Sequence, residues 1–273
     1  MRSKESVDIV SENASQPIIS ADGKRVIYIR VLGPNQTELW VSDIDGANKV
    51  KLAASGNIST GDWSPDSSQL AFIESKGGEN WLYIVRDDGR DLRQVEWKGE
   101  PLGWQTWSAD GKTLYMSTVG TGSRPQVWKM NADGSHPEEV LEKGCYVVDA
   151  SRDGKYFIGT LFNGKEVGIY QISIADRQIV ALLPGVVTFM VRFASDGKSF
   201  LYPVVSHNEV TIYRQAWSDG KILGKPQIAL RLPFAFGSFY QGGNAYDIAR
   251  DFSTIVYARP GGQADFYLMS RER

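Results

Sequence analysis

The chain has 273 residues, 42% of them hydrophobic and 23% charged, with a formal net charge of −2, which is ordinary for a globular protein. With 30 basic and 32 acidic residues, it lacks the basic excess of a nucleic-acid-binding protein, so we expect no nucleic-acid partner. Its one cysteine, Cys145, excludes an intrachain disulfide, and no apolar run is long enough to insert into a membrane.

Two features of the N-terminal segment bear on the location and the fold of the chain. It has no apolar run of the length that a signal peptide needs. We therefore expect a cytoplasmic location for the chain as written, and an extracytoplasmic one if it is part of a longer membrane protein. Residues 7–10, Val-Asp-Ile-Val, alternate like a short strand.

A turn motif of the form S-x-D-G-K recurs from there to the end of the chain. It appears in full or in weaker copies at Asp22, Asp66, Asp110, Asp153, Asp196 and Asp251. A second turn follows each of the first five copies, at Asp45, Asp88, Asp133, Asp176 and Asp219. Two turn registers that share one period of about 43 residues indicate a repeat protein.

Short runs rich in β-branched and aromatic residues lie between the turns and predict strands. After the first turn they occupy residues 25–31, 69–75, 113–119, 156–162, 199–205 and 254–259. Before the second turn they occupy residues 38–42, 81–86, 126–130, 167–172, 211–216 and 265–270. Four strands in each period of this length are typical of propeller blades. We therefore predict an all-β fold, a six-bladed β-propeller with four antiparallel strands per blade.

The whole chain, residues 1–273, is predicted to form this single propeller domain. The blades are expected at residues 14–54, 58–97, 102–143, 146–184, 188–232 and 243–273. The last blade ends after its third strand, so we expect residues 7–10 to complete it. Such closure removes the open sheet edge that would otherwise favour aggregation.

The repeat resembles that of TolB-like propellers: an S-x-D-G-K turn, an apolar strand, then a strand ending near D-x-D-G. The resemblance covers essentially the whole chain. This family includes periplasmic TolB, the non-catalytic propellers of prolyl oligopeptidase-type enzymes, and C-terminal propellers of bacterial serine/threonine kinases and transcriptional regulators. The tail, residues 242–247 and 257–262, looks most like the last group. The resemblance implies the fold and leaves the function open.

Equivalent positions on the predicted innermost strands carry three acids and one arginine. Four residues before the first-turn aspartates stand Ile18, Asp62, Thr106, Asp149, Arg192 and Asp247. Around the central channel such charges could concentrate the electric field and select a cation or a basic peptide. Alternatively, they bond to neighbouring backbone and brace the blades.

The long gap before the last blade contains four aromatic residues on a glycine-flanked loop, Phe234, Phe236, Phe239 and Tyr240. Exposed apolar patches often mark interfaces, but this loop could equally fold over the channel mouth as a plug. Trp104, expected near the channel mouth, is a further candidate ligand contact. By contrast, Trp63 and Trp107 share one repeat position and are predicted to pack between blades.

Motifs for catalysis and metal binding are incomplete. No G-x-S-x-G motif occurs, and the G-K-T of residues 111–113 has Thr106 where a phosphate-binding loop needs glycine. His136 and His207 lie far apart in the chain and do not form a metal-binding pattern. We therefore predict no catalytic residue, no metal and no cofactor.

The leading hypothesis is a non-catalytic binding or sensing module, monomeric, that holds a protein segment or a small ligand at the channel mouth. One rival is an enzyme, such as a lyase or glycan hydrolase, with paired carboxylates in the channel. Another is a separated regulatory domain of a larger kinase- or peptidase-like protein. The predicted binding residues are Asp62, Trp104, Asp149, Arg192, Asp247, Phe236, Phe239 and Tyr240.

Overall fold

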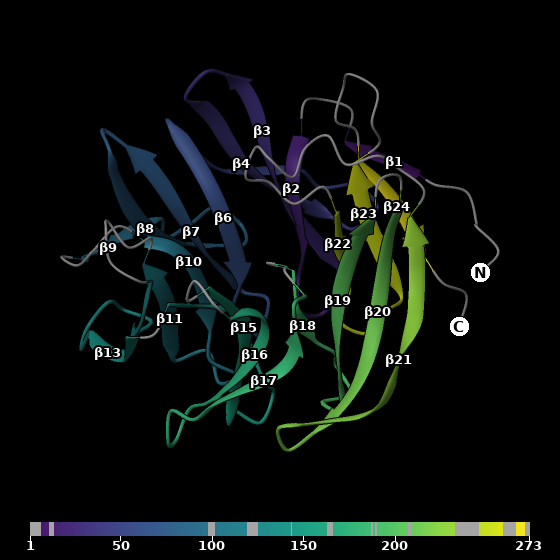
Figure 1. Ribbon diagram of the computed structural model, residues 1–273. Helices are drawn as coiled ribbons and strands as arrows, with labels where there is room; N and C mark the ends of the chain where they lie inside the picture. Colours follow the sequence, from purple (N-terminus) through teal and green to yellow (C-terminus); the bar gives the residue numbers. More distant parts are fainter. Residues whose placement is uncertain are drawn as a thin grey trace. The chain divides into compact units, whose positions relative to one another are not determined.

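The computed structural model describes residues 7–10, 14–97, 102–118, 125–142, 144–162, 166–186, 188, 190–206, 209–232, 246–258 and 266–270. Every regular element in these ranges is a β-strand (Figure 1). Consequently none of the described residues belongs to a helix long and apolar enough to cross a membrane. The chain divides into two compact units, Met1–Glu96 with Ala235–Arg273, and Trp97–Phe234.

The first unit contains two sheets of four consecutive antiparallel strands. The first sheet has the order β2 (Ala14–Ile19), β3 (Arg25–Gly33), β4 (Gln36–Asp43) and β5 (Val50–Ser55). The second has the order β6 (Asn57–Trp63), β7 (Gln69–Lys76), β8 (Glu79–Arg86) and β9 (Arg93–Val95). Their bounds agree with the repeat predicted from the sequence.

A third sheet of this unit joins the two ends of the chain. Its order is β22 (Tyr246–Ile248), β23 (Thr254–Ala258), β24 (Phe266–Ser270) and β1 (Val7–Val10). β1 pairs antiparallel with β24, with Val7 opposite Leu268 and Val10 opposite Phe266. In Figure 1 the purple N-terminal strand accordingly lies beside the yellow C-terminal strands. The prediction that residues 7–10 complete the last sheet is confirmed.

The second unit contains three more sheets of four consecutive strands. One comprises β10 (Leu102–Trp107), β11 (Thr113–Thr118), β12 (Gln126–Asn131) and β13 (Glu138–Glu142). The next comprises β14 (Cys145–Ala150), β15 (Tyr156–Phe162), β16 (Val167–Ser173) and β17 (Ile179–Pro184). The last comprises β18 (Arg192–Phe193), β19 (Ser199–Ser206), β20 (Glu209–Ser218) and β21 (Lys221–Leu232).

The sheets support only part of the prediction of six blades. In the described residues, five sheets are each formed by consecutive strands, and the remaining sheet is the composite of both chain ends. A continuous stretch of chain therefore supplies five complete sheets. An arrangement of six blades in one ring depends on the composite sheet and stays a prediction.

Local hydrogen bonds explain why the repeated S-x-D-G-K sequence makes a turn. The Gly23 N–H donates to the Ser20 carbonyl at 2.9 Å. The Ser20 hydroxyl donates to Asp22 Oδ1 at 2.6 Å and accepts the Arg25 N–H at 2.9 Å. Gly23 has φ of +75°, a region in which glycine carries no steric penalty. The same hydroxyl bonds recur at Ser64, Ser108 and Ser151.

The fifth copy of this turn lacks the serine and uses other donors. Ala194 stands in its place, and the Ser199 hydroxyl donates to Asp196 Oδ1 at 3.1 Å. The Arg214 guanidinium donates to the same carboxylate and to the Ser199 hydroxyl, the latter at 2.9 Å. The aspartate therefore remains anchored although the motif is degenerate.

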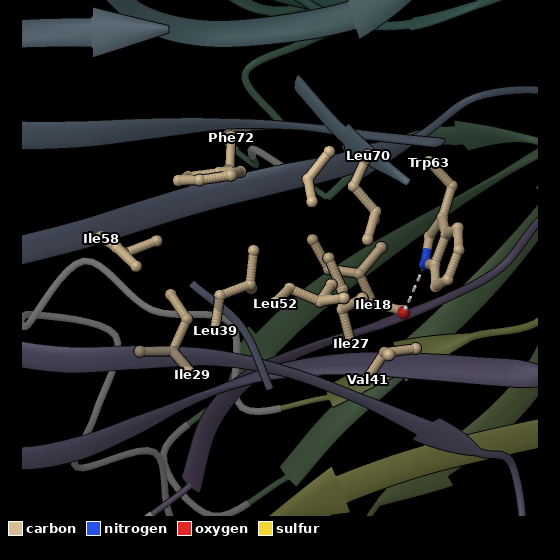
Figure 2. Close-up of a cluster of buried hydrophobic side chains, with 11 residues drawn as sticks. Ile18, Ile27, Ile29, Leu39, Val41, Leu52, Ile58, Trp63, Leu70 and Phe72 are labelled. Atoms are coloured by element: carbon tan, nitrogen blue, oxygen red, sulfur yellow. Dashed lines mark hydrogen bonds between the residues drawn. The ribbon is translucent and has the colours of Figure 1, made fainter. Parts of the chain in front are cut away.

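Apolar side chains of adjacent sheets interlock within each unit. In the first unit, Ile18 and Ile27 of one sheet pack with Trp63 and Leu70 of the next (Figure 2). The Trp63 indole N–H also donates to the Ile18 carbonyl oxygen at 3.0 Å. Trp63 and Trp107 are both buried, so their predicted structural role agrees with the structure.

Candidate functional site

The carboxylate of Asp247 lies on β22, the first strand of the composite sheet, and is buried. Its Oδ2 accepts the backbone N–H of Ile19, on β2 of the neighbouring sheet, at 2.7 Å. The two residues are separated by 228 positions in the sequence. Hydrogen bonds to a charged acceptor are the strong ones, so Asp247 ties the C-terminal strands to the first repeat.

Asp149 plays the equivalent part in the second unit. It lies on β14 and is buried, and its Oδ2 accepts the N–H of Phe193, on β18, at 2.8 Å. Both buried acids thus bond to the backbone of the next sheet. This is the bracing alternative of the sequence interpretation, and it explains their position without a ligand.

Asp247→Ala is expected to lower the free energy of unfolding by about 2–3 kcal/mol, because it leaves the buried Ile19 N–H without its charged acceptor. Asp247→Asn keeps a side-chain oxygen and should cost less. Urea unfolding of both variants measures the difference. Glu79→Ala, at an exposed position of β8, is the control and should change stability by less than about 0.5 kcal/mol. Equal stability of Asp247→Ala and the wild type would contradict the bracing role.

First strands of other sheets carry the other candidate residues that the structure describes. Their side chains are more exposed to solvent than those of Asp149 and Asp247. Asp62 on β6, Trp104 on β10 and Arg192 on β18 are each partly exposed. Asp62 Oδ1 accepts the N–H of the following residue, Trp63, at 3.0 Å. Phe236, Phe239 and Tyr240 lie outside the described residues, so their predicted role stays a prediction.

Several inter-sheet contacts had no counterpart in the sequence interpretation. The Thr37 hydroxyl accepts the N–H of Ile58 at 2.8 Å, and the Ser117 hydroxyl accepts the N–H of Val147 at 3.0 Å. Thr37, on β4, and Ser117, on β11, are both buried. The sequence offered one signal for these contacts: a small polar side chain at a strand position that faces inward. Such a side chain indicates a hydrogen bond to a neighbouring sheet.

A buried amide and an indole make a further inter-sheet bond. The Trp217 indole N–H donates to Gln171 Oε1 at 2.6 Å, and the bond is buried. Gln171 lies on β16 and Trp217 on β20, so the bond joins two sheets of the second unit. Trp217 is therefore a structural residue.

The turn aspartates are held ionised by local donors. The hydrogen bond from the Ser64 hydroxyl is the largest influence that lowers the pKa of Asp66, and the Ser108 hydroxyl does the same for Asp110. By contrast, burial raises the pKa of Tyr246, and the neighbouring Asp247 charge adds to the effect. Hydrogen bonding therefore favours the charged form of the turn carboxylates, whereas burial favours the neutral form of the Tyr246 phenol.

The remaining residues considered for chemistry have ordinary surroundings. His136 is exposed, and His207 lies outside the described residues. The Cys145 thiol is buried and packs with Val147 and Phe157, as expected for a small hydrophobic residue. Within the described ranges, no cluster of three or more histidine, cysteine, aspartate or glutamate side chains could hold a metal ion.

The family is decided by a match that covers most of the chain. The description TolB beta propeller domain matches residues 4–227. The chain belongs to the TolB β-propeller domain family. The predicted TolB-like, all-β propeller fold is thereby confirmed.

Two relatives of this TolB-family chain have matched segments of moderate length. The Tol-Pal system protein TolB of Anaeromyxobacter dehalogenans (strain 2CP-C) is 32% identical over 129 residues, which are 47% of this chain and 29% of the relative. An uncharacterized peptidase of Bacillus subtilis (strain 168) is 26% identical over 153 residues, which are 52% of this chain and 22% of the relative. The match thus spans less than a third of either relative's length.

Solved structures resemble the TolB-family chain over nearly all its length. TolB from Acinetobacter baumannii has a TM-score of 0.71 at 16% identity, covering 93% of this chain and 65% of that one. The β-propeller domain of the Trilobed protease from Pyrococcus furiosus has a TM-score of 0.61 at 18% identity, covering 95% and 82%. At such identities the likeness shows the fold alone. These relatives do not support the narrower resemblance to propellers of kinases and transcriptional regulators.

Proposed function

We propose that this chain is a non-catalytic protein-binding module. The supporting observation is its membership of the TolB β-propeller domain family over residues 4–227, together with a relative named as a Tol-Pal system protein. Propeller domains also occur in peptidases among the similar structures, where they accompany an enzyme. A binding role is compatible with both settings.

The proposed contact residues are the partly exposed members of the first strands. In the second unit these are Trp104 and Arg192, and in the first unit Asp62. Arginine and tryptophan are the residue types that most often carry binding energy in protein interfaces. Asp149 and Asp247 are assigned to bracing, because their carboxylates already accept backbone N–H groups. A single propeller of six blades is part of the same proposal.

The test uses the purified full chain as bait in a lysate of its source cells. Trp104→Ala and Arg192→Glu are compared with the wild type, and Lys112→Glu is the matched control, because Lys112 is exposed on a turn of the same unit. We expect one partner, identified by mass spectrometry, to be retained by the wild type and the control. Both contact variants should lose it while keeping the wild-type thermal unfolding midpoint.

Two outcomes would refute the proposal. Capture of the same proteins by all four chains would show that the first strands do not carry the interface. Turnover of an oligosaccharide by the wild-type chain, abolished in Asp62→Asn, would favour the rival lyase or glycan hydrolase, since that chemistry depends on carboxylates.

A further inference from the structure

The outermost strand of the last sheet in the second unit is unusually long. β21 has 12 residues, whereas the outermost strands β5, β9, β13 and β17 have 6, 3, 5 and 6. Within the described residues it pairs with β20 alone and ends the sheet order β18-β19-β20-β21. Figure 1 shows β19, β20 and β21 side by side, with β21 outermost. The other edge of β21 is unpaired within the described residues, and Pro226 is the one residue of the strand without a backbone N–H to donate.

A buried side chain fixes the shape of this strand from its inner side. The register shifts between Arg214 and Ala216 of β20, which leaves Gln215 opposite a bulge in β21. The Gln215 amide, buried, donates to the carbonyl oxygens of Leu223 at 3.1 Å and Gly224 at 3.4 Å. The Gln215 amide therefore supplies the hydrogen-bond donor for both bulge carbonyls. The conformation of the strand is thus preorganised for binding.

The outer surface of β21 is basic and apolar. The strand contains Lys221, Lys225 and Arg231 and no acidic residue. Arg231 forms an ion pair with Glu209 at 2.9 Å, whereas both lysines are exposed and form no ion pair with another described residue. Between them the apolar side chain of Leu223 is 51% exposed.

We propose that β21 is a docking edge for an extended acidic segment of a partner protein, which adds to the sheet as a further strand. Main-chain hydrogen bonds provide affinity in this mode, and alternate side chains provide specificity. Carboxylates on one face of the segment lie beside Lys221 and Lys225, and apolar side chains on its other face cover Ile228. This edge is distinct from the first-strand residues of the proposed function.

Charge also selects against a second copy of the chain at this edge. Two β21 strands placed edge to edge would bring basic side chains together without an acid on either strand. Like charges directly opposite each other destabilise strand pairing, and lysines on edge strands are a known protection against self-association. The same lysines attract an acidic strand, so the edge discriminates between the two occupants.

The test measures binding of a labelled, terminally blocked peptide of alternating glutamate and valine to the full chain. Fluorescence anisotropy should show saturable binding that weakens with added salt. Lys225→Glu should weaken binding by about tenfold, since it replaces attraction by repulsion. Lys112→Glu, Trp104→Ala and Arg192→Glu should bind like the wild type. Hydrogen–deuterium exchange should slow at residues 221–232.

Two further peptides separate strand addition from simple charge attraction. The acidic peptide that is N-methylated at every residue can donate no main-chain hydrogen bond from either edge and should not bind. A peptide of alternating lysine and valine should not bind either. Equal binding of the N-methylated peptide, protection outside residues 221–232, or no binding of the acidic peptide would each overturn the proposal. Because the first-strand variants are included, failure here leaves the proposed function separately testable.

Discussion

Gly159→Ala is expected to lower the free energy of unfolding by at least about 3 kcal/mol, because overpacking against rigid backbone cannot relax cheaply. Gly159 lies in β15, opposite Val147 of β14. A Cβ atom there would lie 2.0 Å from the carbonyl oxygen of Tyr146 and 3.2 Å from the Cα of Val147. Both obstacles are backbone atoms, so the two strands would have to separate.

Thermal and urea unfolding of this variant measure the effect. Gly33→Ala is the matched control, since a Cβ at that strand glycine meets only the Gln36 Oε1 atom, at 3.6 Å. The control should cost less than about 1 kcal/mol. If Gly159→Ala unfolds at the same urea concentration as the control, the close approach of β14 and β15 is wrong.

Trp63→Ala is expected to cost about 3–5 kcal/mol, the usual range for removal of a large buried aromatic side chain. Trp63 is 5% exposed and packs between two sheets against Ile18 and Leu70 (Figure 2). Its loss leaves a cavity and removes the indole N–H bond to the Ile18 carbonyl. Both effects weaken the contact between β2 and β6.

A second variant separates the two contributions. Trp63→Phe retains most of the apolar contact and loses the indole donor, so we expect a cost of about 1–2 kcal/mol. Trp81→Ala, at a partly exposed position of β8, is the control and should cost less than half as much as Trp63→Ala. Similar costs for Trp63→Ala and Trp81→Ala would contradict the role of Trp63 between the sheets.

The two buried aspartates show where the sequence interpretation stopped. Equivalent positions in the repeat placed Asp149 and Asp247 on first strands, and the structure agrees. Whether they bind a ligand or brace neighbouring sheets depended on atoms far away in sequence: the partner of Asp149 is 44 residues distant and that of Asp247 is 228. Only the folded chain brings those N–H groups within hydrogen-bonding distance.

Features that depend on short-range contacts could be predicted from the sequence. The turn at Ser20 and Asp22 is closed by hydrogen bonds between residues at most five positions apart. Its motif can therefore be recognised in the sequence, and the period at which the motif recurs predicts the strands. Three features required the folded chain: the close approach of Gly159 to Tyr146, the bond from the Trp63 indole to the Ile18 carbonyl oxygen, and the unpaired edge of β21. These features depend on which strands become neighbours, and burial and hydrogen bonding across sheets select those neighbours only when the chain folds.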